Sequence, residues 1–108
     1  MKKYNLDKFT RGWLVGDFTP NIIRTKNFEF MVRFYNKGES EQKHVHKIAD
    51  EITVIISGVF LMNNEKLFKG DIIHLLPGDA TDFTCLEDGA TAVIKTPSVM
   101  GDKYILQA

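Results

Sequence analysis

Two histidines separated by one residue, His44 and His46, form the feature that most limits how this chain can fold. Side chains alternate between the faces of a β-strand, so these two imidazoles project from the same side with their Cα atoms about 7 Å apart. Glu51 follows, and glycines stand at positions 38 and 58 on either side. The spacing predicts neighbouring strands that direct two imidazoles and one carboxylate at a shared point.

Two imidazoles and a carboxylate form a ligand set for divalent iron, manganese, zinc or nickel, and they leave coordination positions open for water or substrate. We therefore expect a divalent metal ion at His44, His46 and Glu51. Two alternatives remain open. The histidines can be unligated and satisfied by hydrogen bonds, and Glu51 can be a solvated carboxylate on a loop after Asp50.

The segment 38–58 resembles the first signature motif of the cupin superfamily, which it matches at Gly38, His44, His46, Glu51 and Gly58. The second signature motif is only partly present over residues 70–83, where Thr81 stands at the position at which the family usually places a third histidine ligand. The resemblance implies an all-β, cupin-type double-stranded β-helix, also described as a jelly-roll barrel. It implies no particular reaction, because this fold hosts many unrelated activities.

Short strand-like runs separated by turn residues fill most of the chain, which is typical of a jelly roll or closed β-barrel. Glu87-Asp88-Gly89 is expected to be a turn between strands at 83–86 and 90–95. Residues 1–20 are expected to form an edge strand or an arm onto a partner subunit. Residues 101–106 are expected to pack back on the barrel as a strand or arm.

The bulk properties indicate one domain, residues 1–108. Its 14 basic and 14 acidic residues cancel, so neither nucleic acid nor a membrane surface is an expected partner. The single cysteine, Cys85, is expected to be buried and inert. No apolar run resembles a secretory signal or approaches the ~18 residues of a transmembrane helix, so the cytoplasm is the expected location.

The apolar residues also predict self-association. Eight phenylalanines exceed what the interior of one small barrel readily absorbs. If Glu51 faces inward, strand alternation places Ile52, Val54 and Ile56 on the opposite face, where a second sheet or subunit is needed to cover them. We therefore expect a homodimer.

Further candidate site residues surround the metal ligands. Asp82, beside Thr81, can supply a second carboxylate or a catalytic acid or base only if a bulge turns it inward. Arg33 and Tyr35 share a strand face, and their guanidinium and phenol can anchor a carboxylate, phosphate or sugar hydroxyl, unless Arg33 is merely solvated. Tyr35 is also a candidate catalytic residue, and Lys95 is a second candidate for substrate binding. The cupin pattern directs His74 away from the cavity.

Two functions are consistent with these features. The first is a divalent-metal-dependent enzyme that isomerises, epimerises, cleaves or oxygenates a small polar metabolite such as a sugar or hydroxy-acid. The second is a non-catalytic cupin that binds a small molecule, with a structural metal or none. An enzyme requires a general acid or base next to the bound substrate, whereas a binding protein does not.

Overall fold

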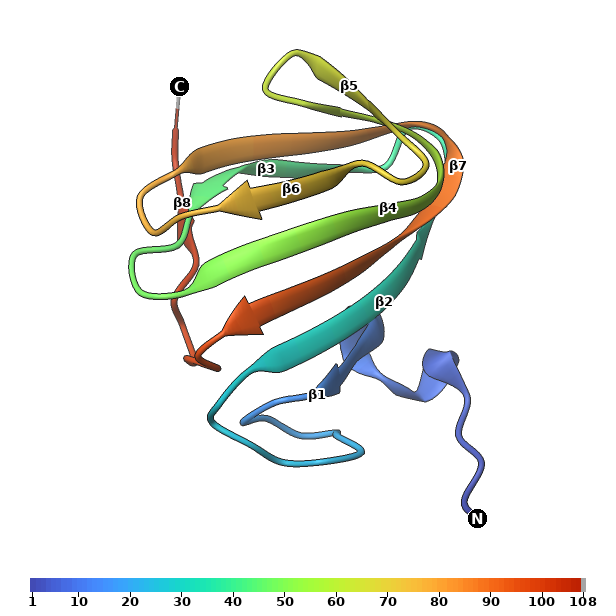
Figure 1. Cartoon of the computed structure of the whole chain (residues 1–108), viewed down its shortest axis with the longest axis vertical. Helices are drawn as coiled ribbons and strands as arrows, with labels where there is room; N and C mark the ends of the chain where they lie inside the picture. Colours follow the sequence, from blue (N-terminus) through green and yellow to red (C-terminus); the bar gives the residue numbers. More distant parts are fainter. Residues whose placement is uncertain (108) are drawn as a thin grey trace.

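Eight β-strands and two short 3₁₀ turns make up the computed structural model, which describes residues 1–107 (Figure 1). The turns span Leu6–Lys8 and Thr10–Gly12. The strands are β1 (Trp13–Val15), β2 (Glu29–Tyr35), β3 (Ser40–Val45), β4 (Asp50–Met62), β5 (Glu65–Phe68), β6 (Ile72–Leu75), β7 (Ala80–Thr96) and β8 (Tyr104–Ile105). The chain is therefore all-β, as the sequence predicts.

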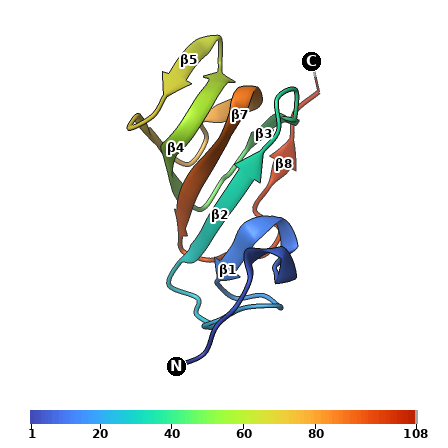
Figure 2. The same ribbon diagram turned by 90° about the vertical axis from the view of Figure 1, so that its right-hand side faces the viewer.

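The two longest strands, β4 and β7, each contribute to both layers of a jelly-roll barrel (Figures 1 and 2). In the first layer, β2 pairs with residues 89–95 of β7, and β6 pairs with residues 51–54 of β4. In the second layer, β3 pairs with residues 80–84 of β7, and β5 pairs with residues 59–62 of β4. Because β4 and β7 also pair with each other, one hydrogen-bonded ladder connects the two layers.

Glycines allow β4 and β7 to bend together from one layer into the other. A Cβ atom on Gly89 would lie 2.1 Å from the carbonyl oxygen of Ser57, and one on Gly58 would lie 2.6 Å from that of Asp88. Gly58 also has a φ of +81°, which favours glycine. The turn predicted at residues 87–89 is therefore wrong, because β7 continues through this bend as a single strand.

Aromatic side chains fill the barrel beside the bend. The ring of Phe60 stacks on Phe83 at a centroid distance of 4.8 Å, and Tyr35 meets both rings edge-on. Cys85 is buried in the same cluster, which confirms the expected burial of this thiol. Burial also raises the pKa of Cys85, so the reactive thiolate is disfavoured.

The outer face of the first layer is apolar and exposed. Cross-strand neighbours on this face form two rows, Phe30-Ile94-Ile52-His74 and Val32-Ala92-Val54-Ile72. Ile52, Ile56 and Ile72 are exposed, as is Phe34 on β2. This arrangement confirms the predicted alternation, in which Ile52, Val54 and Ile56 face away from the barrel interior.

One strand near each end of the described chain, β1 and β8, pairs with a strand of the barrel. β1 pairs with β2 as an edge strand, and two 3₁₀ turns precede it within residues 1–20; an arm onto a partner stays a prediction. β8 pairs with β3, opposite His44 and Val45, so the C-terminal segment does pack back. Within residues 1–107, no helix has the length and apolar character needed to cross a membrane.

Candidate functional site

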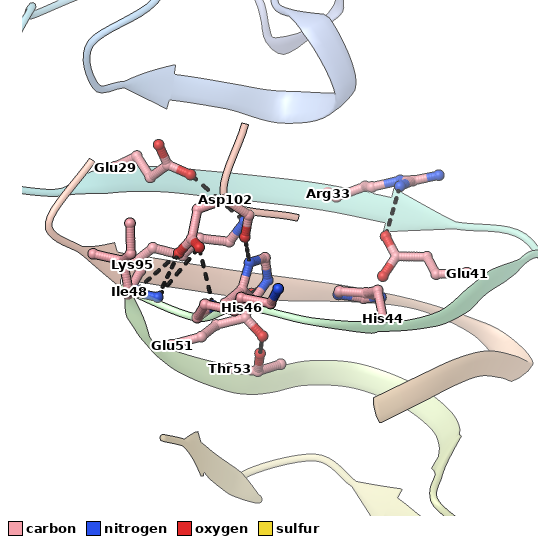
Figure 3. Close-up of polar contacts among 12 residues, drawn as sticks. Glu29, Arg33, Glu41, His44, His46, Ile48, Glu51, Thr53, Lys95 and Asp102 are labelled. Carbon is pink, nitrogen blue, oxygen red and sulfur yellow. Dashed lines mark hydrogen bonds and ion pairs between the residues drawn. The ribbon is translucent and has the colours of Figure 1, made fainter. Parts of the chain in front are cut away.

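His44 lies near the end of β3 and His46 directly follows that strand, and both direct their rings to the same region of the barrel interior (Figure 3). Their ring centroids are 5.2 Å apart and their planes are nearly perpendicular. Each residue is only 6% exposed. The shared orientation predicted from the His-x-His spacing is therefore present.

Backbone carbonyl groups determine which nitrogen of each imidazole carries hydrogen. The Nδ1 atom of His44 lies 2.9 Å from the carbonyl oxygen of Gln42, and that of His46 contacts the carbonyl oxygen of Asp102. A carbonyl oxygen only accepts, so Nδ1 donates in both rings and the neutral imidazole keeps a lone pair on Nε2. The Nε2 atom of His46 is buried and has no hydrogen-bond partner in residues 1–107.

The surroundings favour the neutral form of both imidazoles. Burial is the main cause that lowers the pKa of His44 and of His46, and the nearby charge of Lys95 lowers both further. Hydrogen bonds to the backbone oppose this effect without reversing it. A neutral imidazole is the form that can ligate a metal ion.

Glu51, at the start of β4, supplies a carboxylate next to His46. Its Oε1 atom lies 3.9 Å from Nε2 of His46, and its Oε2 atom accepts a weak hydrogen bond from Thr53 at 3.5 Å. Burial raises the pKa of Glu51, while the charge of Lys95, its cross-strand neighbour on β7, lowers it. The net effect is a carboxyl group that takes up a proton more readily than one in water.

The side chains of His44, His46 and Glu51 carry the kinds of donor atom that bind a divalent metal ion, but they lie farther apart than metal ligands do. Two Nε2 lone pairs and one carboxylate are suitable donors, and the buried Nε2 of His46 has no hydrogen-bond partner among the residues that the structure describes. Nδ1 atoms that donate to carbonyl groups are also typical of metal-ligating histidines. Yet, within residues 1–107, no three His, Cys, Asp or Glu side chains are grouped closely enough to hold a metal ion.

Asp102 is a structural residue of the site that the sequence did not reveal. Its carboxylate accepts hydrogen bonds from the backbone N–H groups of Lys47, Ile48 and Ala49, which form the loop after His46 (Figure 3). Asp102 therefore fixes this loop with its side chain and the ring of His46 with its carbonyl group. More than fifty residues separate the partners, so no local pattern indicates the contact.

The structure settles where Thr81 and Asp82 point. Thr81 is buried and is the cross-strand neighbour of His44 in the pair of β3 and β7. The side chains of Thr81 and His44 line one cavity of the barrel interior. Asp82 is exposed, and its carboxylate accepts a hydrogen bond from the backbone of Asn63 in the turn between β4 and β5. The predicted inward role of Asp82, as a ligand or catalytic group, is therefore wrong, because the irregularity in this strand pair lies on β3, between Glu41 and His44, and Asp82 keeps the outward position of regular alternation on β7.

Arg33 and Tyr35 face the interior together, as predicted, but both side chains already contact the carboxylate of Glu41. Arg33 lies 3.2 Å from Glu41, and its guanidinium stacks over the ring of Tyr35. The hydroxyl of Tyr35 donates to Glu41 at 3.4 Å. Burial, followed by the charge of Glu41, raises the pKa of Tyr35 well above its ordinary value, so this phenol stays protonated at neutral pH.

Two cavities meet around Lys95. The smaller, about 120 Å³, is lined by His44, Glu51 and Thr81, together with Arg33 and Tyr35. The larger, about 290 Å³, is lined by His46, and Lys95, Lys103 and Trp13 border both cavities. Lys95 is thus close to the candidate ligands, where it was expected, although its ammonium also lies 3.6 Å from Glu29. His74 lies outside, hydrogen bonded to Asp50.

No family model matches the chain, and no curated protein sequence matches it. Solved structures are similar in fold. An uncharacterized conserved protein with a double-stranded β-helix domain from Klebsiella pneumoniae has a TM-score of 0.72 at 18% identity, over 99% of this chain and 93% of that one. An RmlC-like cupin from Shewanella frigidimarina has a TM-score of 0.65 at 18% identity, over 72% of each chain.

A third similar structure is oxalate decarboxylase from Bacillus subtilis, a protein with Mn(II) centres. Its TM-score is 0.65 at 15% identity, and the match covers 76% of this chain but only 25% of the larger protein. At these identities the likeness concerns the fold and not the activity. The chain therefore has the double-stranded β-helix fold of the cupins.

Proposed function

We propose that the protein binds a divalent metal ion through His44, His46 and Glu51 and uses it to act on a small polar metabolite. The observation that carries this proposal is the buried Nε2 atom of His46, which has no partner in residues 1–107 and lies beside Glu51. A buried polar atom without a partner is unfavourable, and a metal ion would relieve this. Small movements of Glu51 and the imidazoles would complete the ligand set.

When bound, a divalent metal would polarise an oxygen atom of the substrate. The protein's own groups have distinct roles around it. Lys95 attracts an anionic group toward the ligands, and the protonated Tyr35 orients Glu41 and Arg33 at the cavity wall. A sugar or hydroxy-acid, whose hydroxyl and carboxylate groups suit this lining, is the substrate class that we favour. Isomerisation, epimerisation, lysis and oxygenation are the reactions to test.

The proposal is tested by metal affinity. We expect His46→Ala to weaken the binding of Zn²⁺ and Mn²⁺ by at least about 100-fold, because it removes one ligand of three. His74→Ala is the matched control, since His74 is exposed and hydrogen bonded to Asp50, and it should bind as the wild type does. Calorimetric titration measures all three proteins. Equal affinity for His46→Ala and the wild type would refute the ligand assignment.

The alternative is a small-molecule-binding cupin without catalysis, which is favoured by the loose spacing of the three donors and by the absence of Asp82 from the site. Incubation of the metal-loaded protein with sugars and hydroxy-acids in D₂O, followed by NMR, separates the two. An enzyme produces new signals or exchanges carbon-bound hydrogen, and His46→Ala abolishes this. A binding protein only broadens the ligand signals.

A further inference from the structure

Glu41 supplies a second carboxylate to the smaller cavity, and the proposed metal site does not use it. It lies on β3 and lines this cavity together with His44 and Glu51. Its side chain is only 28% exposed. A carboxylate so placed can contact a molecule that is bound beside the candidate ligands.

The two oxygen atoms of Glu41 differ in their contacts. Oε1 accepts hydrogen bonds from Nη1 of Arg33 at 3.2 Å and from the hydroxyl of Tyr35 at 3.4 Å. Oε2 accepts no hydrogen bond from any group of residues 1–107. Two donors on β2 therefore hold the carboxylate through one oxygen, and the other is left to accept from a ligand (Figure 3 shows Glu41 between Arg33 and His44).

The neighbouring charge favours a neutral donor at Oε2 over a cationic one. Arg33, which lies 3.2 Å from Glu41, already compensates the charge of this carboxylate. A ligand ammonium group at Oε2 would be repelled by Arg33 as well as attracted by Glu41. A hydroxyl group donates hydrogen without adding a charge, so it is the better partner.

The rest of the lining is also suited to hydroxyl groups. The side chains of Thr53, Thr81 and Thr91 line the same cavity, and each hydroxyl can both donate and accept. The volume of the cavity is about 120 Å³, whereas a cavity of roughly 150 Å³ holds benzene. This volume suits a three-carbon hydroxy-acid better than a whole sugar ring.

We propose that Oε2 of Glu41 accepts a hydrogen bond from a hydroxyl group of the substrate, and that the substrate is a compact hydroxy-acid with a second hydroxyl group. Glu41 then determines specificity by direct contact, while Arg33 and Tyr35 position it. The inference rests on the proposed function, because it places this substrate in the same site.

Glycerate and lactate differ by one hydroxyl group, so the ratio of their affinities measures this contact. By calorimetric titration of Zn²⁺-loaded protein, we expect glycerate to bind about tenfold more tightly than lactate. 3-Fluorolactate, whose fluorine replaces the second hydroxyl and cannot donate, should bind as lactate does. Isoserine, which carries an ammonium group there, should bind less tightly than glycerate.

Three results would overturn the proposal on the wild type alone. They are a failure to bind glycerate, equal affinities for glycerate and lactate, and 3-fluorolactate or isoserine binding as tightly as glycerate. None of these measurements depends on whether a variant folds.

Variants assign the contact to Glu41. Glu41→Ala should reduce the ratio of glycerate to lactate affinity from about ten to about one. The substitution also frees Arg33 to attract carboxylates, so the ratio is the measure and not either affinity. Glu39→Ala is the matched control, because Glu39 lies 3.7 Å from Arg33 but does not line the cavity, and it should keep the ratio. An unchanged ratio in Glu41→Ala would overturn the assignment.

The same ratio in chelator-treated protein separates this inference from the proposed metal site, since the contact with Glu41 needs no metal. If the wild type fails to bind Zn²⁺ but keeps the tenfold ratio, the metal proposal fails and the contact stands. If Zn²⁺ binds through His46 but the ratio is one, the present inference fails and the metal site stands.

Discussion

Asp102 holds the loop after the two histidines through a buried carboxylate. Burial by itself would raise its pKa, but the hydrogen bonds from Ala49, Lys47 and Ile48 outweigh this effect and hold the pKa below its ordinary value. A carboxyl group with a depressed pKa in the folded state stabilises the fold above its unfolded pKa, near pH 4. The stabilisation is lost as pH falls through the folded pKa.

We therefore predict that Asp102→Ala lowers the free energy of unfolding at pH 7 by about 1–3 kcal/mol, since it leaves three N–H groups without their acceptor. The difference from the wild type should shrink as pH falls below about 4. Urea unfolding at several pH values measures both effects. A constant difference between pH 7 and pH 3 would contradict this role for the carboxylate.

For single residues, the sequence predicted the strand face on which a side chain lies better than it predicted the side chain with which it pairs. Alternation placed His44 with His46, and Arg33 with Tyr35, on common faces. It did not predict that Glu41 neutralises Arg33, because that carboxylate comes from another strand. The alternation of side chains along a strand is a local property of the sequence, whereas the pairing of two side chains depends on how strands that are distant in the sequence meet.

Among the elements, β7 differs most from its prediction. Glu87-Asp88-Gly89 has the composition of a turn, yet the chain passes through it as an extended strand. Gly89 is required because β4 and β7 lie close together there, and not because the chain reverses its direction. The backbone at Ser57 leaves no room for a side chain at this position. Turn composition alone does not separate these two uses of glycine.

Gly89→Ala should therefore be strongly destabilising, by about 3 kcal/mol, because the new Cβ atom would meet backbone atoms of β4 that cannot move aside. Gly70→Ala is the comparison, since Gly70 has a positive φ of 91° but nothing within 4 Å of an added Cβ atom. It should lose only about 1 kcal/mol. Denaturant unfolding compares the two variants, and a smaller loss for Gly89→Ala would refute the close-contact account.

For the whole molecule, the apolar outer face of the first layer supports the expected homodimer. The exposed rows across β2, β7, β4 and β6 include Ile52 and Ile72, and a second copy can present the same rows in return. A stable interface of this kind buries about 800 Å² on each partner.

We predict a dimer at micromolar concentration by light scattering after gel filtration. Ile52→Lys should convert it to a monomer, because a charge at the centre of the rows would be buried without a partner. Phe68→Lys, on exposed β5 outside the rows, should leave the dimer intact. A monomeric wild type would contradict the prediction.

The proposed metal site requires that His44 and His46 are neutral, carry hydrogen on Nδ1 and present Nε2 to a shared site. Long-range ¹H–¹⁵N NMR measures this directly, and exposed His74 serves as an internal reference. At pH 7 we predict hydrogen on Nδ1 of both buried rings, with Nε2 signals that shift when Zn²⁺ is added. Hydrogen on Nε2, or a Zn²⁺-dependent shift at His74 alone, would contradict the assignment of His44 and His46 as ligands.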